Sequence, residues 1–240
     1  MSTNKPQWTN MSFLLTFLGL TGTIVFTAFG AFDEFSEKEK HLRSALITET
    51  AVNIIAGVTY TYMIKYLNEK SIVPGEITSI RYLDWLLTTP FLILSFMFYS
   101  NYVENKHTKK DEKIIKVNYT PLAWILPLNI IMLVFGFLGE ENQISNTLSL
   151  VGGFGAFIGL FVAIWDAYVK DKPEEMETIF IPFLIVWLLY GVAFLLKGDA
   201  KEISYNFLDL ISKTGFGIFL WGNNVDRENN TCNVECNQKN

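Results

Sequence analysis

Charged residues are scarce in this 240-residue chain: Asp, Glu, Lys and Arg make up 18% of it, and His occurs twice. The net charge is −5, and no basic patch is interleaved with aromatic residues, so the chain lacks the pattern of a nucleic-acid-binding protein. No group of side chains resembles a metal site or an enzymatic nucleophile, and we therefore expect neither a metal centre nor an enzyme. The two cysteines, Cys232 and Cys236, are too few for a disulfide framework.

The chain is rich in long hydrophobic segments. Hydrophobic residues account for 50% of it, with 20 Phe, and its mean hydropathy is +0.26. Apolar stretches long enough to cross a membrane core of about 30 Å recur along the chain. We count seven, near residues 11–33, 43–67, 79–101, 119–138, 145–169, 176–197 and 203–222. The sequence therefore predicts an all-α bundle of seven transmembrane helices in residues 1–222, followed by a polar tail in residues 223–240.

Lysine and arginine are distributed unevenly between the connecting segments. The segment GEENQISN has none, and KGDAKE has only Lys197 and Lys201. The first, third and fifth segments carry ten cations: Lys38, Lys40, Arg43, Lys106, Lys109, Lys110, Lys113, Lys116, Lys170 and Lys172. Because basic loops remain in the cytoplasm, we expect the N-terminus outside and the polar tail in the cytoplasm.

An ionisable pair lies inside the last apolar stretch, ISYNFLDLISKTGFGIFLWG. Asp209 precedes Lys213 by four residues, about one helical turn. Each such charge at membrane depth costs roughly 2.5–3.5 kcal/mol on insertion scales. A buried lysine can form a Schiff base with an aldehyde, and a nearby carboxylate can balance the resulting cation. The alternative is a purely structural ion pair.

The third apolar stretch, SIRYLDWLLTTPFLILSFMFYS, carries a second polar set. Asp84 and Thr88 are four residues apart, so they share a helix face and can hydrogen-bond. Ser95 lies eleven residues after Asp84, which places it on the same stripe about 16 Å further along the axis. Two structural alternatives remain open: the hydroxyls are ordinary helix-contact groups, and Arg81 forms an ion pair with Asp84.

The segments RYLDWLLTTP and DLISKTGFG occur in this order, and together they closely resemble the microbial rhodopsins, the retinal-binding membrane proteins that include bacteriorhodopsin and proteorhodopsin. The segment IMLVFGFLGE is especially similar to proteorhodopsin. The resemblance covers nearly all seven stretches and ends near Trp221. The Asp-Thr-Ser signature at residues 84, 88 and 95 also resembles that of some rhodopsins of large algal viruses.

The resemblance implies roles for the polar residues. Lys213 would carry all-trans retinal as a protonated Schiff base. Asp84 would be the main counterion and first proton acceptor, and Asp209 the second counterion. Arg81 would gate the outward side, and Thr88 would hydrogen-bond Asp84.

The resemblance also implies a chromophore pocket and an outward proton-release group. Glu202 is the nearest carboxylate for proton release. Leu92 implies absorption of green light. The positions that would enclose the chromophore are Trp85, Leu92, Met132, Gly136, Trp187, Tyr190 and Phe194.

Ser95 and Asn129 are two of the positions that depart from the pattern of the pumps. Ser95 stands where pumps have a carboxylate as cytoplasmic proton donor, and a serine hydroxyl cannot serve as such an acid near neutral pH. Reprotonation would then be slow, or pass through water or another group such as Glu49. Asn129 stands where some pumps have an aspartate near the retinal ring.

The leading hypothesis is a light-driven outward proton pump that lies in membrane lipid and forms a homo-oligomer, a trimer or a pentamer. Two other functions remain open. A light-gated ion channel would use the polar interior around Glu49, Asn53 and Asn129. A photosensory rhodopsin would signal through a separate transducer, because the chain has no appended signalling domain.

Overall fold

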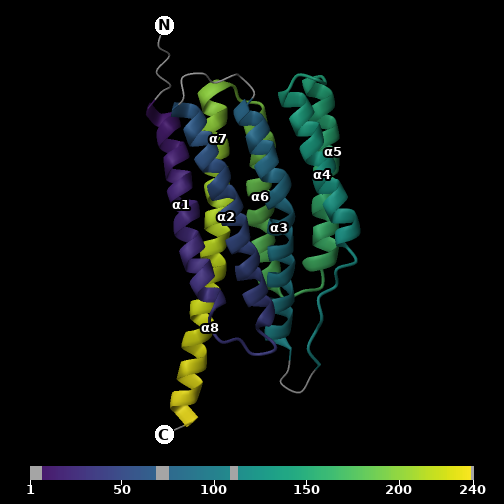
Figure 1. The fold of residues 1–240 in the computed structure, drawn as a ribbon. Coiled ribbons are helices and arrows are strands. Elements are labelled where there is room, and N and C mark those ends of the chain that lie inside the picture. Colours follow the sequence, from purple (N-terminus) through teal and green to yellow (C-terminus); the bar gives the residue numbers. More distant parts are fainter. Residues whose placement is uncertain (1–6, 69–75, 109–112, 239–240) are drawn as a thin grey trace.

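The structure, a computed structural model, describes residues 7–68, 76–108 and 113–238, and all regular elements in these ranges are helical. The last three elements follow one another without a gap and form one continuous helical rod from Gly198 to Gln238, which we call the last rod. The bundle therefore consists of seven rods (Figure 1). This confirms the predicted all-α seven-helix fold. The elements are α1 (Gln7–Ala31), α2 (Lys40–Asn68), α3 (Glu76–His107), α4 (Leu122–Glu140), α5 (Asn146–Tyr168), α6 (Glu174–Phe194), α7 (Gly198–Asp209), the π-helical segment η1 (Leu210–Gly215) and α8 (Phe216–Gln238).

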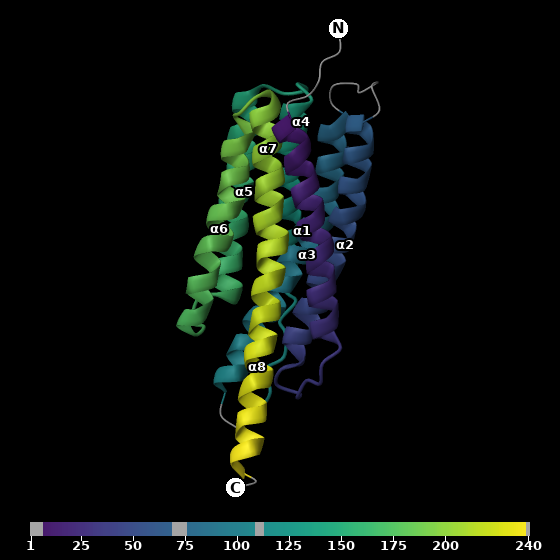
Figure 2. The same cartoon turned by 90° about the vertical axis from the view of Figure 1, so that its left-hand side faces the viewer.

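The last rod is longer than the apolar stretch 203–222 that the sequence predicted. Figure 2 shows α8 running past the other helices toward the C-terminus. The polar tail, residues 223–240, therefore continues the helix as far as Gln238. Its first turns are anchored to the chain after α1: Asn224 donates to the carboxylate of Asp33, and Arg227 Nη1 donates to the backbone oxygen of Glu34 at 2.7 Å.

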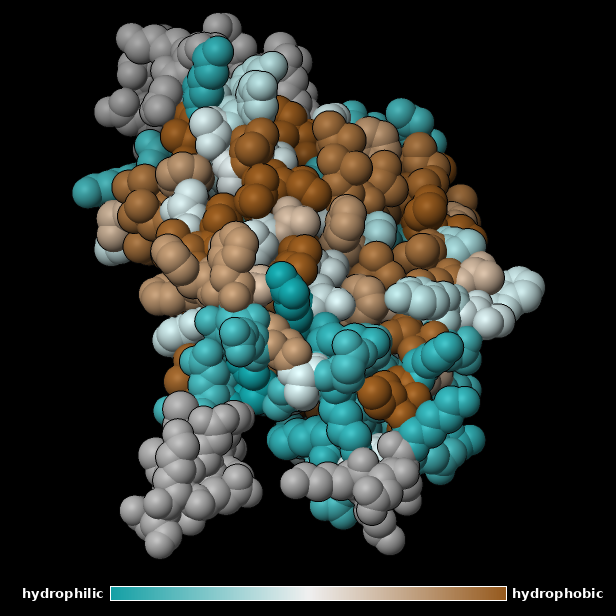
Figure 3. All heavy atoms as spheres, turned by 60° about the horizontal axis from the view of Figure 1, so that its bottom comes forward, coloured by the Kyte–Doolittle hydropathy of each residue, from teal (hydrophilic) through white to brown (hydrophobic). Residues whose placement is uncertain are grey.

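Within the described residues, α1, α3, α4, α5 and α6 are each long and apolar enough to cross a membrane. The other two predicted spans differ for physical reasons: α2 carries buried polar residues, and η1 interrupts the last rod. Both stand in the same bundle as the apolar helices (Figures 1 and 2). Figure 3 shows apolar side chains around the sides of the bundle and hydrophilic ones at the end from which α8 emerges. This distribution suits a protein surrounded by lipid.

The half of the bundle toward α8 is filled by aromatic side chains. Phe183 of α6 lies at its centre, with ring centroids 4.9 Å from Phe96, 5.2 Å from Trp187 and 6.0 Å from Phe216. These contacts join α3, α6 and α8 in one apolar cluster. The cluster separates the interior of the bundle from the end that carries the C-terminus.

The π-helical segment contains Lys213, and Asp209 is the last residue of α7. Short π-helical segments inside α-helices are uncommon and frequently mark functional sites. The local change of helical pitch therefore falls on the ionisable pair that the sequence singled out.

Candidate functional site

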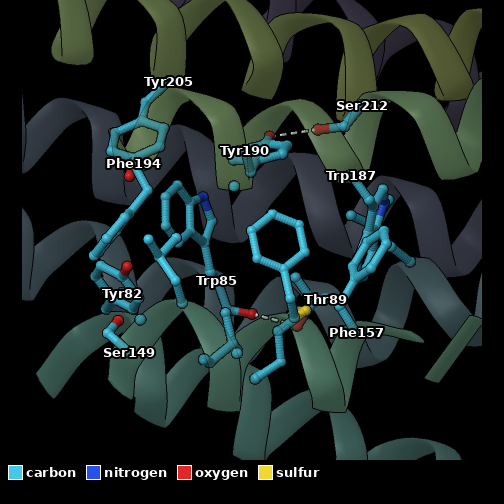
Figure 4. A pocket seen from close by; sticks show the side chains of 18 of the residues that line it. Tyr82, Trp85, Thr89, Ser149, Phe157, Trp187, Tyr190, Phe194, Tyr205 and Ser212 are labelled. Carbon is cyan, nitrogen blue, oxygen red and sulfur yellow. Dashed lines mark hydrogen bonds between the residues drawn. The ribbon is translucent and has the colours of Figure 1, made fainter. Parts of the chain in front are cut away.

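An apolar pocket lies between α3, α4, α5, α6 and the last rod (Figure 4). Figure 4 shows Tyr82, Phe194 and Tyr205 grouped at one end of it, and Trp187 with Phe157 at the other. Lys213 is the charged residue in its lining. The lining includes every residue that the sequence assigned to the chromophore: Trp85, Leu92, Met132, Gly136, Trp187, Tyr190, Phe194 and Lys213.

Lys213 projects from η1 between two carboxylates. Its Nζ contacts Oδ2 of Asp84 on α3 and lies 3.2 Å from Oδ1 of Asp209. Lys213 is 1% exposed, and both aspartate side chains are fully buried. The spacing of Asp209 and Lys213 predicted the second contact, whereas the first joins residues 129 positions apart.

Asp209 is the better-bonded carboxylate of the two. Its Oδ1 accepts hydrogen bonds from Trp85 Nε1 at 3.0 Å and from Tyr190 Oη at 2.7 Å. Its Oδ2 accepts from Tyr60 Oη at 2.7 Å and lies 3.4 Å from Arg81 Nη1. Hydrogen bonds and a cation around a buried carboxylate stabilise its charged form. Both carboxylate oxygens of Asp209 therefore have hydrogen-bond donors besides Lys213.

Among the described residues the carboxylate of Asp84 has a single hydrogen bond, with Lys213, and its Oδ1 has no partner. The predicted hydrogen bond from Thr88 goes elsewhere, because the hydroxyl donates to the backbone oxygen of Asp84 at 2.8 Å and not to the carboxylate. Threonine in a helix commonly bonds the carbonyl one turn earlier, which satisfies the hydroxyl within its own helix. The carboxylate of Asp84 therefore has fewer hydrogen bonds than that of Asp209.

Arg81 lies on the side of the ion pair that faces the N-terminal end of the bundle. Its Nη2 is 2.8 Å from Oε2 of Glu202 and donates to Oδ1 of Asn206 at 2.8 Å. The described residues contain no ion pair between Arg81 and Asp84, the structural alternative left open by the sequence. Arg81 instead connects Asp209 to Glu202, which is 22% exposed in its side chain.

On the opposite side, Ser95 is fully buried and donates to the backbone oxygen of Ala45 at 3.1 Å. Glu49 of α2 lies beside Ser95 and is also fully buried. Its Oε1 accepts from Asn53 Nδ2 at 3.2 Å, while Oε2 has no partner among the described residues. A Cβ added at Gly217 would lie 3.3 Å from Glu49 Cγ. Since Gly217 is four residues after Lys213, Glu49 packs against the last rod about one turn from the lysine.

Two hydrogen-bonding residues beside Arg81 were missed by the sequence reasoning. Asn206 Oδ1 accepts from Arg81 and lies 3.1 Å from Tyr60 Oη. Asn206 is three residues before Asp209, a spacing that places both on one helix face and offered a signal. Tyr60 lies within the polar run TYTY of α2, where nothing distinguished it from its neighbours.

Two further contacts at the pocket join neighbouring elements. Figure 4 shows Ser212 facing Tyr190, with the two hydroxyl oxygens 2.9 Å apart. Since Tyr190 donates its single proton to Asp209, Ser212 is the donor in this pair. Asn129 Nδ2 donates to Thr89 Oγ1 at 2.7 Å and so ties α4 to α3.

Comparison with known proteins gives relatives that match over most of their length. The green-light absorbing proteorhodopsin of Gamma-proteobacterium EBAC31A08 is 26% identical over 95% of this chain and 90% of its own. Sensory rhodopsin-2 of Haloarcula vallismortis is 26% identical over 84% and 86%. The crystal structure of the viral rhodopsin OLPVRII is 29% identical, covers 91% of this chain and 98% of that one, and superimposes with a TM-score of 0.78.

Members of the family to which these relatives belong bind retinal through a lysine Schiff base, and the apolar helices indicate an integral membrane protein. The family model for bacteriorhodopsin-like proteins matches residues 8–226, which span all seven rods. The chain therefore belongs to the bacteriorhodopsin-like family, the microbial (type 1) rhodopsins.

Proposed function

We propose that this protein is a light-driven outward proton pump with all-trans retinal joined to Lys213 as a protonated Schiff base. One observation carries the proposal: the buried amine of Lys213 touches Asp84, a carboxylate with no other hydrogen bond in the described structure. When bound, retinal supplies the absorption of visible light and a change of shape that alters the surroundings of the lysine nitrogen. The pocket fits a polyene, because aromatic and aliphatic side chains line it and its one charged group is the attachment amine.

Asp84 is the proposed proton acceptor, and the contrast with Asp209 supports this choice. Taking a proton leaves Asp84 neutral at little cost in hydrogen bonds, since its Oδ1 has no partner among the described residues. Asp209 would have to give up favourable bonds from Trp85, Tyr60 and Tyr190. The proton affinities of the two carboxylates and the amine are coupled, so each transfer changes the others.

Arg81 and Glu202 are proposed to conduct the proton onward to the outer medium. Arg81 lies 2.8 Å from Glu202 and 3.4 Å from Asp209, so it connects the ion pair at Lys213 to the more exposed carboxylate. A cation beside a carboxylate favours its ionised form, and that is the form able to accept a proton. When Asp84 gives up the proton it received, Glu202 would accept it and then lose it to the outer medium.

Glu49 is proposed as the group that returns a proton to the Lys213 nitrogen. Ser95 cannot do so as an acid, whereas Glu49 is a carboxyl group beside it. No ion pair of Glu49 occurs among the described residues, and a buried carboxylate without a cation is costly. The free Oε2 is the atom that would carry the proton, and a bridging water would complete the path.

The test of the proposed function is illumination of retinal-loaded vesicles or cells while the pH of the outer medium is recorded, that is, on the side opposite the cytoplasmic face. Outward pumping acidifies the outer medium, and a protonophore abolishes the signal. If the outer medium shows no protonophore-sensitive acidification, the protein is not an outward proton pump.

A light-gated channel is the second candidate function. It is favoured by a group of buried polar atoms without partners in the described structure: Glu49 Oε2, Asn53 Oδ1 and Thr214 Oγ1. These atoms lie on α2 and on η1, where water could enter and hydrate a path. Photocurrents that reverse sign with membrane voltage would support the channel, and current in one direction at all voltages would support the pump.

A photosensor acting through a separate transducer is the third candidate, favoured by the similarity to Sensory rhodopsin-2. A sensor would complete its photocycle without net transport. Transport and photocycle measured on the same vesicles separate the two functions.

The proposed direction of pumping requires the N-terminus outside and the C-terminus in the cytoplasm. The connections after α1, α3 and α5, which carry most loop lysines, lie at the end from which α8 emerges (Figure 1). A C-terminal epitope that antibodies reach only after permeabilisation would establish this orientation.

Native mass spectrometry would test the proposed trimer or pentamer.

A further inference from the structure

Tyr99 connects three helices at the proposed cytoplasmic end of the bundle. It lies on α3, and its side chain is fully buried. Its hydroxyl lies 3.0 Å from Oε1 of Glu175 on α6 and 3.1 Å from Oδ1 of Asn223 on α8. A single phenol group therefore links α3 to both α6 and α8.

The phenol has one proton but two acceptors. Asn223 presents its oxygen to Tyr99 because its Nδ2 donates to the backbone oxygen of Phe219 at 2.9 Å. The other acceptor, Glu175, offers a carboxylate oxygen. A phenol donates one hydrogen bond at a time, so bonding to α6 and bonding to α8 compete. The contact has the form of a two-position switch.

The switch lies between the aqueous surface and the buried proton path. On the side toward the aqueous surface, the side chain of Glu175 is 31% exposed and pairs with Lys106 at 3.4 Å and His107 at 3.5 Å. On the side toward the interior of the bundle, Ser95 is four residues before Tyr99, on the same face of α3. The ring of Phe219 packs edge-on against the ring of Tyr99 with centroids 5.1 Å apart, a second contact between α3 and α8.

We propose that Tyr99, Glu175 and Asn223 form a cytoplasmic gate, with Glu175 as the carboxylate at which protons are taken up. A proton from the cytoplasm binds the Glu175 carboxylate and makes it a weaker acceptor. Tyr99 then donates to Asn223, α6 loses its bond to α3, and water reaches Ser95 and Glu49. The proton returns from Glu175 to this water, and the ionised carboxylate recovers the Tyr99 hydroxyl. The direction of proton flow rests on the proposed pump, but the gate itself is a claim about water access.

The gate is tested first in retinal-free protein, by the reactivity of a cysteine placed at Ser95. Cys232 and Cys236 are replaced by serine, Ser95→Cys is introduced, and the rate of labelling by a water-soluble thiol reagent is measured. Tyr99→Phe keeps the aromatic ring and removes only the hydroxyl. We expect labelling to become about tenfold faster, the factor that corresponds to loss of one hydrogen bond to a charged group. Glu175→Gln, which imitates the protonated carboxyl, should accelerate labelling in the same direction.

The matched control is Tyr102→Phe. Tyr102 is a buried tyrosine three residues along the same helix, and among the described residues its hydroxyl has no hydrogen-bond partner. Equal acceleration by Tyr102→Phe, or unchanged labelling in Tyr99→Phe and Glu175→Gln, would overturn the gate. Thermal melting of each variant identifies acceleration that comes from general loosening of the bundle.

A second measurement separates the gate from the pump. In retinal-loaded vesicles, a pH-sensitive dye on the cytoplasmic side should report faster proton uptake in Tyr99→Phe, with unchanged timing of Asp84 protonation. Faster labelling in vesicles that show no transport would keep the gate and reject the pump. Normal transport with unchanged labelling would keep the pump and reject the gate.

Discussion

Asp84 and Asp209 contact the same Lys213 amine, but only Asp209 is held by other donors. Tyr60 and Tyr190 each donate to Asp209 at 2.7 Å, whereas Oδ1 of Asp84 has no partner in the described structure. Two chemically identical side chains therefore differ in how many hydrogen bonds hold them. The following experiments test this asymmetry and the path on either side of it.

Replacing Lys213 by alanine should abolish the pigment. The change removes the amine in the pocket lining, so an aldehyde added to the membranes has no attachment point there. The absorption spectrum after addition of all-trans retinal is the measurement. Lys201→Gln is the control, because Lys201 pairs with Glu140 at 2.9 Å outside the pocket and should leave the colour intact. An equally coloured Lys213→Ala variant would refute the attachment site.

Asp84→Asn should shift the absorption to the red and reduce outward transport to the protonophore-treated level. The amide can no longer balance the charge at Lys213, nor take its proton, while Asp209 still lies 3.2 Å away and holds the pigment together. Spectra and light-driven pH changes on the same vesicles check both results. Undiminished transport in Asp84→Asn would show that another group accepts the proton.

Glu202→Gln should delay the appearance of protons in the outer medium without delaying the protonation of Asp84. Glu202 lies 2.8 Å from Arg81, on the far side of that residue from the amine, and so acts after the first transfer. A pH-sensitive dye outside the vesicles reports release, and the infrared carbonyl band of Asp84 reports the first transfer. Release at the normal time would remove Glu202 from the path.

Glu49→Gln should slow the return of the proton to Lys213 by about 10²-fold, the lower range for loss of a positioned acid. A small weak acid such as hydrazoic acid should restore the rate in the variant by acting as a diffusing donor. Glu104→Gln is the control, because Glu104 pairs with Lys172 at 2.6 Å near the surface. An unchanged recovery in Glu49→Gln would make Glu49 a structural residue.

Infrared spectra of the retinal-free protein give a second readout for Glu49. A protonated carboxyl should contribute a carbonyl band that disappears in Glu49→Gln. A difference spectrum without that band would mean that Glu49 is ionised at rest, which is inconsistent with a donor.

Gly152→Ala should destabilise the bundle, by about 1–3 kcal/mol if it behaves like other overpacked cores. A Cβ at residue 152 would overlap the ring of Phe135, whose Cγ is 2.7 Å from that position. Gly155→Ala, on the same helix, meets open space, and alanine there should be neutral or stabilise the helix by roughly 0.5–1 kcal/mol. Thermal melting of both variants in the same detergent makes the comparison. Equal melting temperatures would show that α4 and α5 separate without strain.

The sequence by itself determined the number of helices and the ionisable pair that Lys213 forms with Asp209 within the same rod. These features are local: apolar length predicts a membrane helix, and a spacing of four residues places Asp209 and Lys213 on one face. The resemblance to rhodopsins added residues on other helices, and every residue that it assigned to the chromophore lines the pocket. The roles of these residues remain predictions.

Only the tertiary structure decided which groups meet across helices. It gave Thr88 a backbone partner, paired Arg81 with Glu202 instead of Asp84, and placed Glu49 against the last rod. The bonds of Tyr60 and Tyr99 likewise join residues more than 70 positions apart. Such contacts depend on how each helix is rotated and tilted against its neighbours, and the periodicity of a single helix carries no information about that.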